Sequence, residues 1–401
     1  MLFPSISARA PGSAPAATNR GRLSLSHVTF LLLFPGFFFY QTLLGLGKIS
    51  GFLGGYFSQI TAIFMLPLLI SYARQMKRSP PSSRVDLYFG IYVAYFTLII
   101  CINFLAGANV TTVLTHLSAV GYYVALFIIF KTINLDHQLF KSCLVFSLFA
   151  MAAVIFNSSI DGSFYLATQN LARDSERVAT YQGFSRSYFL TLAVGISVIK
   201  LPHTRAIIYC VAAPALYLNG ARSEFVALLF MLPIIEVYRA RRKMLTLAVI
   251  IAIVAIAAFN FDLIVNALPK NRILELLDLS QSSSANARHE LKLFAMHTIL
   301  TNPVFGDYAS YPPGDYAHNL LSAWVDLGLF GFIFLLALLL LPALSLIPRG
   351  LSRASTSNEC LLAFFLLSVT LFLLVTSHYF VDMTTGAALG AYSNYRSRRK
   401  P

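Results

Sequence analysis

Two arginines and one histidine stand out in this sequence because of the chemistry that they could perform together. They are Arg222 in LNGARSEF, Arg288 in ARHELKLFAMHTIL, and His318, which precedes Asn319. A guanidinium group binds phosphate oxygens through paired hydrogen bonds and keeps its charge. Two such groups could hold a diphosphate and stabilise it as a leaving group, while an imidazole beside them could accept a proton from an attacking hydroxyl.

Each of the three residues also has a simpler interpretation. Arg222 could extend from a helix end towards water, Arg288 could be solvated on an exposed helix, and His318 could merely neighbour Asn319, which would cap the next helix. Only convergence in space would distinguish the two interpretations. Because the N-terminus of a long helix disfavours positive charge, we expect the pKa of His318 to be lowered and the imidazole to be neutral near pH 7.

The elements that carry these residues are apolar segments of membrane length. The chain has 401 residues, of which 57% are hydrophobic and 11% are charged, and its mean hydropathy is +0.70. Soluble domains carry about 25% charged residues, whereas an apolar helix of about 20 residues crosses a bilayer. The sequence therefore predicts an all-α, polytopic integral membrane protein with about 12 transmembrane helices.

Two sizeable loops, at about residues 158–183 and 263–318, separate the predicted spans, and most other connections are short. The spans are residues 28–47, 52–73, 86–106, 110–130, 139–157, 184–200, 205–219, 223–238, 244–262, 319–343, 361–378 and 383–395. The short last span is included because it returns the C-terminal RSRRK to the side that carries most other basic residues. We expect residues 1–26 to be a disordered cytoplasmic tail and residues 27–401 to be one transmembrane domain with a large periplasmic loop at 263–318.

The basic residues predict the orientation of these spans. Cytoplasmic loops retain Lys and Arg, and most of the 30 basic residues share one side if the N-terminus is cytoplasmic. The net charge of +14 then faces anionic lipid head groups, so we expect membrane lipids and no nucleic acid as partners. The larger loops lie outside, and there ARHELKLFAMHTIL, with Leu291, Phe294 and Ala295 on one stripe, predicts an amphipathic surface helix.

From Arg222 to its C-terminus the chain resembles the bacterial O-antigen ligase and O-antigen polymerase superfamily. The likeness is most specific between Ala287 and Gly331, where an arginine opens a surface helix, TNPVFG matches an Asn-Pro-x-x-Gly turn, and HN precedes GLFG. The resemblance implies an inner-membrane glycosyltransferase that moves glycans from undecaprenyl diphosphate carriers on the periplasmic face. It also implies that Arg222 and Arg288 bind the diphosphate and that His318 is the general base.

The resemblance further implies an inverting reaction that needs no metal ion and no cofactor. The first outer loop, about residues 48–51, agrees with this expectation because it lacks the acidic residue that metal-dependent membrane glycosyltransferases usually place there. One feature departs from the ligase pattern, since one residue fewer separates the His-Asn pair from Gly328. On a continuous helix this change rotates His318 by about 100° relative to the glycine.

The departure favours a polymerase over a ligase. A polymerase uses another carrier-linked repeat unit as the acceptor, whereas a ligase uses the lipid A core. A transporter of a lipid-linked or anionic substrate is an alternative from a different class, because transporters keep ionisable residues within their spans. The candidates for such a role are Asp326, Asp382, Glu224 and Glu236, which we interpret instead as residues of helix packing or of the membrane interface.

Five further residues near the outer side could contribute to a site. His116 and His378 lie near outer helix ends, where we expect structural roles. Tyr308, Tyr311 and Tyr316 in the outer loop could stack on sugar rings.

Overall fold

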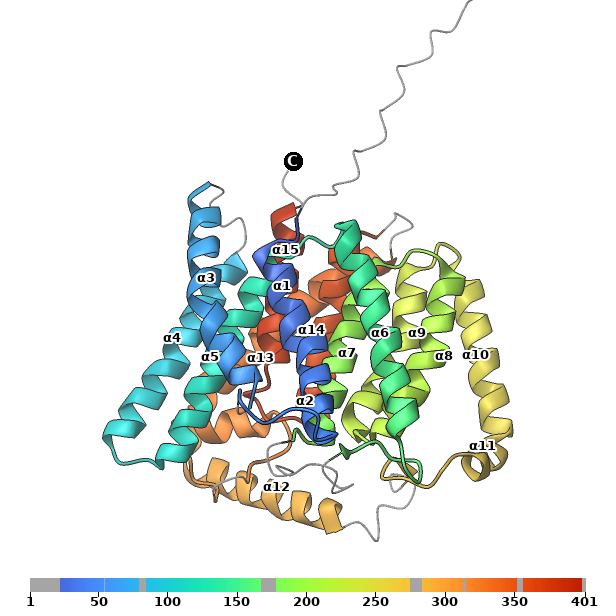
Figure 1. Ribbon diagram of the computed structural model, residues 1–401. Coiled ribbons are helices and arrows are strands. Elements are labelled where there is room, and N and C mark those ends of the chain that lie inside the picture. Colours follow the sequence, from blue (N-terminus) through green and yellow to red (C-terminus); the bar gives the residue numbers. More distant parts are fainter. Residues whose placement is uncertain are drawn as a thin grey trace, which may run out of the picture.

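The structure, a computed structural model, describes residues 22–53, 55–78, 84–166, 178–274, 283–312, 315–351 and 356–398. Within these ranges every regular element is a helix, as the sequence predicts. The helices form a bundle, and α12 (Ser283–Thr301) lies across one end of it (Figure 1).

Most helices coincide with the predicted apolar segments. The first part of the chain forms α1 (Leu25–Leu31), η1 (Leu32–Gly36), α2 (Phe37–Gly45), α3 (Phe57–Arg78), α4 (Arg84–Leu105), α5 (Val110–Thr132) and α6 (Gln138–Ser158). The remainder forms α7 (Tyr181–Val198), α8 (Pro202–Asn219), α9 (Arg222–Arg239), α10 (Lys243–Phe259), α11 (Phe261–Ala267), α12, α13 (Leu321–Leu351), α14 (Asn358–Thr376) and α15 (Thr384–Arg398). The elements α1, η1 and α2 together match the first predicted span.

The number of membrane spans is confirmed only in part. Among the described residues, 7 helices are long and apolar enough to cross a membrane, or 8 if α10 and α11, bent by 70°, form one span. Helices α7, α8, α9 and α15 occupy predicted spans but fall outside this set. The full count of about 12 and the periplasmic side of the loop at 263–318 therefore stay predictions.

The ends of two predicted segments differ from the observed helices. The first helix begins at Leu25, where the Ser24 hydroxyl accepts a hydrogen bond from the His27 amide, so the predicted tail at 1–26 extends slightly into it. The rest of that tail, up to residue 21, lies outside the described residues. The ninth predicted span stops at Phe259, because the chain bends at Asn260 before α11.

The short twelfth predicted segment forms α15, which packs inside the bundle against α5. A Cβ atom on Gly386 would lie under 3.0 Å from the Tyr123 carbonyl oxygen, and one on Gly390 would lie equally close to the Phe127 carbonyl oxygen. Small residues allow two helix backbones to approach this closely. Helix α15 therefore contacts protein along its length, and most of its side chains are buried.

Helix α12 rests on the bundle through one stripe of side chains. Ala295, Thr298 and Ile299 are buried, so the predicted helix is observed and packs on the bundle through one side. Leu293, Met296 and Leu300 are exposed, so apolar residues are not confined to that side and the predicted amphipathic pattern is not found. Phe294, predicted on the same stripe, is 40% exposed, although its ring centroid lies 5.1 Å from that of Tyr311. This stripe packs on α13, the long helix that begins just after His318.

Helix α13 is interrupted at Gly328, and the turn that follows α12 fills the interruption. Gly328 has φ 69° and ψ −178°, so α13 consists of two helical pieces. The Leu329 amide donates to the Val304 carbonyl at 3.0 Å, and the Asp307 amide donates to the Val325 carbonyl at 2.7 Å. The turn thus satisfies backbone groups that a helix break would otherwise leave without partners.

Two glycines make this contact possible. Gly306 and Gly328 both have positive φ, at 70° and 69°. A Cβ atom on Gly306 would lie under 3.0 Å from the Val325 carbonyl oxygen, and one on Gly328 would lie equally close to the Val304 carbonyl oxygen. Because the opposing atoms belong to the backbone, neither can move aside easily, and the contact fixes α12 against the first piece of α13.

We predict that Gly328→Ala lowers the thermal unfolding midpoint of the purified protein in detergent micelles. The left-handed backbone conformation alone costs a residue with a side chain about 1–3 kcal/mol, and the clash with Val304 adds to this. Gly90→Ala is the matched control, because that glycine lies within α4 and nothing lies within 4 Å of an added Cβ atom. We call the contact between the turn after α12 and the break in α13 the interlock. Equal unfolding midpoints for the two variants would show that the interlock does not stabilise the protein.

Candidate functional site

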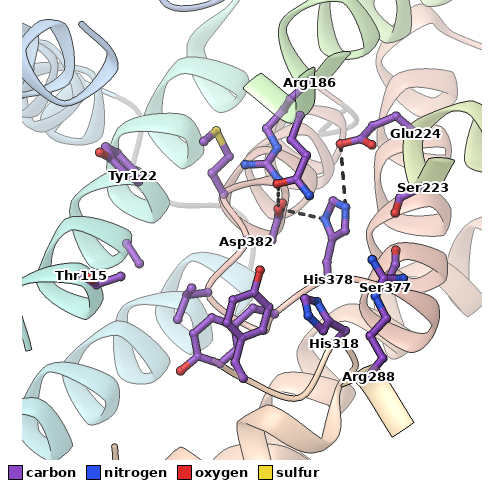
Figure 2. Close-up of a pocket in the computed structure, with 16 residues that line it drawn as sticks. Thr115, Tyr122, Arg186, Ser223, Glu224, Arg288, His318, Ser377, His378 and Asp382 are labelled. Atoms are coloured by element: carbon purple, nitrogen blue, oxygen red, sulfur yellow. Dashed lines mark hydrogen bonds and ion pairs between the residues drawn. The ribbon is translucent and has the colours of Figure 1, made fainter. Parts of the chain in front are cut away.

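A cavity of about 300 Å³ opens at the end of the bundle that α12 covers. Its walls come from the beginnings of α5, α7 and α9, from α12, from the loop before α13, and from the turn between α14 and α15 (Figure 2). Segments far apart in the sequence therefore supply one site.

Two of the three predicted site residues line this cavity. Arg288, on α12, and His318, in the loop before α13, both contribute to its wall. Arg222 begins α9, and the next two residues, Ser223 and Glu224, line the cavity. The charge of Arg222 helps to lower the pKa of Arg288, so the two guanidinium groups are electrostatically coupled. The structure thus groups these residues, while their roles stay predictions.

Local backbone features place each of these side chains. Helix α8 ends at Gly220, whose φ of 74° turns the chain so that α9 begins at Arg222. Arg288 lies about two turns before Ala295, where the buried stripe of α12 begins, and is itself partly buried. His318 precedes Asn319, whose side chain accepts a hydrogen bond from the Leu321 amide at 3.0 Å. The expected capping by Asn319 is therefore observed together with the placement of His318 in the cavity.

The surroundings of His318 favour the neutral imidazole. Burial is the largest cause that lowers its pKa, and the positive charge of Arg288 is the second, while a hydrogen bond with the backbone of Ser377 opposes both. The Tyr316 ring lies against the imidazole, with 4.5 Å between ring centroids. The predicted lowering of the pKa is confirmed, but its main cause is burial rather than the dipole of the following helix.

Arg288 brings a positive charge that the described part of the protein does not neutralise directly. Burial and the nearby Arg222 lower the pKa of its guanidinium group, and no ion pair with a described residue offsets them. An arginine nevertheless stays charged at physiological pH. An anion that contacts Arg288 would therefore relieve the repulsion between the two guanidinium groups.

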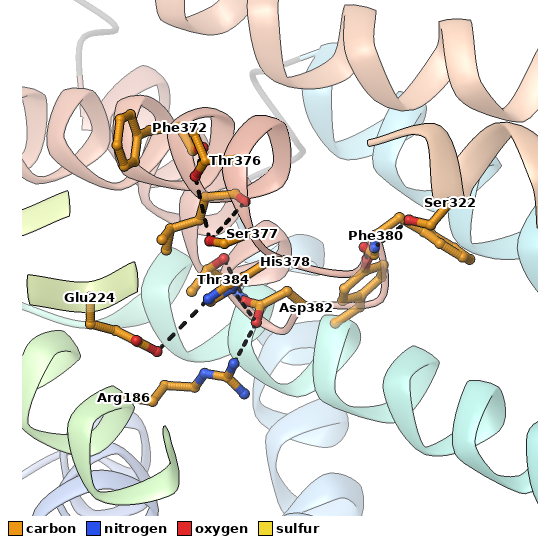
Figure 3. Close-up of polar contacts among 12 residues, drawn as sticks. Arg186, Glu224, Ser322, Phe372, Thr376, Ser377, His378, Phe380, Asp382 and Thr384 are labelled. Carbon is orange, nitrogen blue, oxygen red and sulfur yellow. Dashed lines mark hydrogen bonds and ion pairs between the residues drawn. The ribbon is translucent and has the colours of Figure 1, made fainter. Parts of the chain in front are cut away.

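A chain of buried and partly buried ionisable residues that the sequence did not predict forms another wall of the cavity. Arg186 pairs with Asp382 at 2.8 Å, and His378 Nδ1 lies 2.9 Å from the same carboxylate oxygen (Figure 3). His378 Nε2 faces Glu224 at 3.8 Å. The Asp382 and Glu224 side chains are only 4% and 3% exposed. Four residues from three parts of the chain are thus linked beside Arg288 and His318.

Asp382 holds this chain of residues together. Its second oxygen accepts hydrogen bonds from the Thr384 amide at 2.9 Å and the Thr384 hydroxyl at 2.7 Å, which fixes the start of α15. Burial alone would raise the pKa of this carboxyl group, but the positive charge of Arg186 and the contact with His378 hold it well below its usual range. Asp382 is therefore an anion that compensates Arg186.

Two polar atoms of this wall have no hydrogen-bond partner among the described residues. They are Arg186 Nε, a donor, and Glu224 Oε1, an acceptor, and both are buried. Buried polar atoms of this kind are rare in folded proteins, where they mark functional sites or bound molecules. The cavity thus offers a ligand both a donor for an anionic group and an acceptor for a hydroxyl or amide hydrogen.

Sequence reasoning interpreted Glu224 and Asp382 as packing or interfacial residues and expected a structural role for His378. All three line the cavity, and Arg186 was not considered at all. One signal could have identified Arg186, because it lies inside the apolar predicted span at 184–200, where an ionisable residue is expensive and usually functional. Its pairing with a residue 196 positions away is not visible in the sequence.

The other ionisable residues considered above have internal partners. Glu236 accepts hydrogen bonds from Arg205 at 2.7 and 2.6 Å, and Asp326 accepts one from the Tyr379 hydroxyl at 2.6 Å. Both nitrogens of His116 contact tyrosine hydroxyls, at 2.9 and 2.8 Å, which agrees with its expected structural role. In the described ranges, no group of three or more His, Cys, Asp or Glu residues is arranged to hold a metal ion.

Comparison with known proteins gives no family for this chain. No family model matches it, and no curated protein matches it. The resemblance to the O-antigen ligase and polymerase superfamily therefore rests on the sequence motifs themselves, and the site must be judged by its geometry.

We predict that Arg288→Gln raises the pKa of His318, because the variant removes a positive charge that disfavours the imidazolium ion. NMR titration of isotope-labelled histidine in the full-length protein measures this change. Lys292→Gln is the matched control, since Lys292 is exposed on the same helix. An unchanged pKa in Arg288→Gln would show that the two side chains are not coupled.

We predict that Asp382→Asn destabilises the protein by about 1–3 kcal/mol, because it leaves Arg186, whose side chain is 27% exposed, without its counter-ion. The stabilisation by the carboxylate is present above about pH 4 and is lost as the pH falls, since the folded-state pKa lies below the unfolded one. Equilibrium unfolding in mixed micelles measures the change, and Arg186→Met should partly rescue it.

Asp136→Asn is the control for that experiment. Asp136 pairs with Lys141 at 3.6 Å and its side chain is 60% exposed. Exposed pairs contribute about 0–1 kcal/mol, so this variant should unfold almost as the wild type does. Similar losses for the two variants would refute the compensating role of Asp382.

Proposed function

We propose that the protein is a membrane glycosyltransferase that transfers a glycan from an undecaprenyl diphosphate carrier to a sugar hydroxyl, as a repeat-unit polymerase or, alternatively, as a ligase. The observation that carries the proposal is that Arg288 and His318 line one cavity, with Arg222 electrostatically coupled to Arg288. Apolar helices surround this cavity, so a lipid tail and a water-soluble glycan could meet there.

Arg222 and Arg288 bind the diphosphate in this proposal. Guanidinium groups match the planar geometry of phosphate oxygens, and their charges stabilise the negative charge that develops on the leaving group. Their mutual repulsion is relieved when the anion binds. The role that a metal ion has in other glycosyltransferases with lipid-linked donors thus falls to side chains.

His318 acts as the general base. The acceptor hydroxyl oxygen attacks the anomeric carbon and forms the new glycosidic bond, while the bond between that carbon and the phosphate oxygen breaks. The electron pair of the broken bond remains on the diphosphate, and the hydroxyl proton moves to the imidazole. Attack opposite the leaving group inverts the anomeric centre. The lowered pKa of His318 supports this role because it keeps the imidazole neutral.

The distribution of charge supports a site on the periplasmic face of the bacterial inner membrane. Helix α9 begins beside the cavity at Arg222 and ends at Arg239, which is followed closely by Arg241 and Arg242. Cytoplasmic ends of spans retain such clusters. The cavity lies at the other end of this helix and therefore faces outward in the proposed orientation.

The break in α13 affects what the spacing between the His-Asn pair and Gly328 indicates about polymerase and ligase. Helix α13 begins at Leu321 and is broken at Gly328, so His318 and Gly328 do not share a continuous helix. A difference of one residue between them need not rotate His318. The spacing therefore no longer counts against the ligase alternative, and the choice depends on the chemistry of the acceptor.

We predict that His318→Ala lowers the transfer rate by about 10²–10⁴-fold while expression and membrane insertion remain near normal. Arg222→Ala and Arg288→Ala should abolish long-chain glycan, and Arg288→Lys should also be impaired, because an ammonium group cannot form the paired hydrogen bonds of a guanidinium group. Transfer by the purified protein in nanodiscs measures these effects. Lys292→Ala is the matched control, and normal transfer by His318→Ala would refute the assignment of the base.

A further inference from the structure

A second cavity, of about 130 Å³, adjoins the first. Thr115, Tyr316 and Tyr379 line both cavities. The Tyr316 ring stacks on Tyr379 with centroids 4.5 Å apart and also lies 4.5 Å from the His318 ring. Tyr316 therefore stands between the two cavities, and its ring lies against the imidazole of His318, which lines the first.

The two cavities differ in charge. Arg186 and Arg288 line the first together with Asp382 and Glu224, whereas the described residues that line the second include Asp315 and Asp326 but no Lys or Arg. Guanidinium groups are therefore available only in the first. Carboxylates repel phosphate groups and tolerate neutral or cationic ones. The diphosphate of a donor thus suits the first cavity, and the second suits a group without negative charge.

Several polar groups around the second cavity are engaged within the protein. Asp326 accepts hydrogen bonds from the Tyr379 hydroxyl at 2.6 Å and the Ala309 amide at 3.0 Å. His116 contacts Tyr379 and Tyr308 through its two nitrogens. These bonds hold the wall in a fixed arrangement, which is what a preformed binding site requires.

The Tyr311 hydroxyl differs from these groups. Tyr311 is only 7% exposed, lines the second cavity, and makes no hydrogen bond of normal geometry with the described residues. Burial is the largest cause that raises the pKa of this phenol, Asp326 adds to the rise, and the backbone of Ala317 offsets part of it. A buried hydroxyl without a partner is unfavourable unless a bound molecule satisfies it.

We propose that the second cavity binds the acceptor sugar as an uncharged or amino-substituted ring, with the Tyr311 hydroxyl bonded to one of its hydroxyls. The aromatic rings at Tyr316 and Tyr379 offer apolar faces to the ring, and the threonine hydroxyls at the start of α5 offer further polar contacts. This inference rests on the proposed glycosyltransferase function. It favours an acceptor without phosphate near the reacting hydroxyl, as a neutral repeat unit would be.

Tyr311→Phe tests this inference. Carrier-linked glycan is extracted from cells that lack the protein, and mild acid releases part of it as free glycan for use as the acceptor. Transfer to this free glycan is measured with the full-length protein in nanodiscs. We expect the half-saturating acceptor concentration to rise about tenfold, as for the loss of one hydrogen bond, while the affinity for undecaprenyl diphosphate stays unchanged. The thermal unfolding midpoint should change little, because the hydroxyl makes no hydrogen bond of normal geometry with the described residues.

Ser118→Ala is the control, since Ser118 lies on α5, donates to the Leu114 carbonyl at 2.8 Å and lines neither cavity. If Tyr311→Phe transfers to the free glycan with the acceptor dependence of the wild type, the second cavity does not bind the acceptor, although the transferase function stands. Weaker binding of undecaprenyl diphosphate by Tyr311→Phe would also overturn the assignment. If the wild type transfers no glycan at all, the proposed function itself fails.

Discussion

The interlock between the turn after α12 and the break in α13 is the contact on which the site depends. Each of these segments needs the other, because the broken helix supplies backbone groups that only the turn satisfies, and Gly306 and Gly328 allow the two backbones to touch. Helix α12 lies across the end of the bundle and packs chiefly on α13 (Figure 1). Together with the buried stripe of α12, this contact holds Arg288 at a fixed distance from His318.

The second constraint is the charge of the two arginines that line the main cavity, because only one of them has an ion-pair partner among the described residues. Asp382 compensates Arg186, and the described residues provide no ion pair for Arg288. Such an arrangement costs stability, since like charges in a partly buried cavity repel one another. Natural proteins keep such unfavourable features at functional sites, where a bound ligand relieves them. The same imbalance that weakens the fold thus favours an anionic ligand.

The sequence alone was sufficient to predict most of the helices and part of the site. Apolar length predicted most helical segments, and the order of Arg288, the Asn-Pro turn and His318 indicated which residues to examine, because these motifs lie close together in the chain. It did not reveal Arg186, His378 or the second cavity, since these depend on contacts between α7, the α14 to α15 turn and α5. Nor did it reveal the break at Gly328, because a glycine within an apolar run also fits a continuous helix.

The two histidines of the main cavity illustrate why geometry, rather than residue type, decides which could act as a base. His378 has one nitrogen bonded to Asp382 and the other facing Glu224, so both of its nitrogens are directed at carboxylates. His318 instead lies between the charge of Arg288 and the ring of Tyr316, where the imidazolium ion is disfavoured. A base must offer a free lone pair to the hydroxyl that it deprotonates. His318 lines the main cavity and forms no ion pair with a described carboxylate, so it is the better candidate for the proposed base, whereas His378 is suited to holding the wall in place.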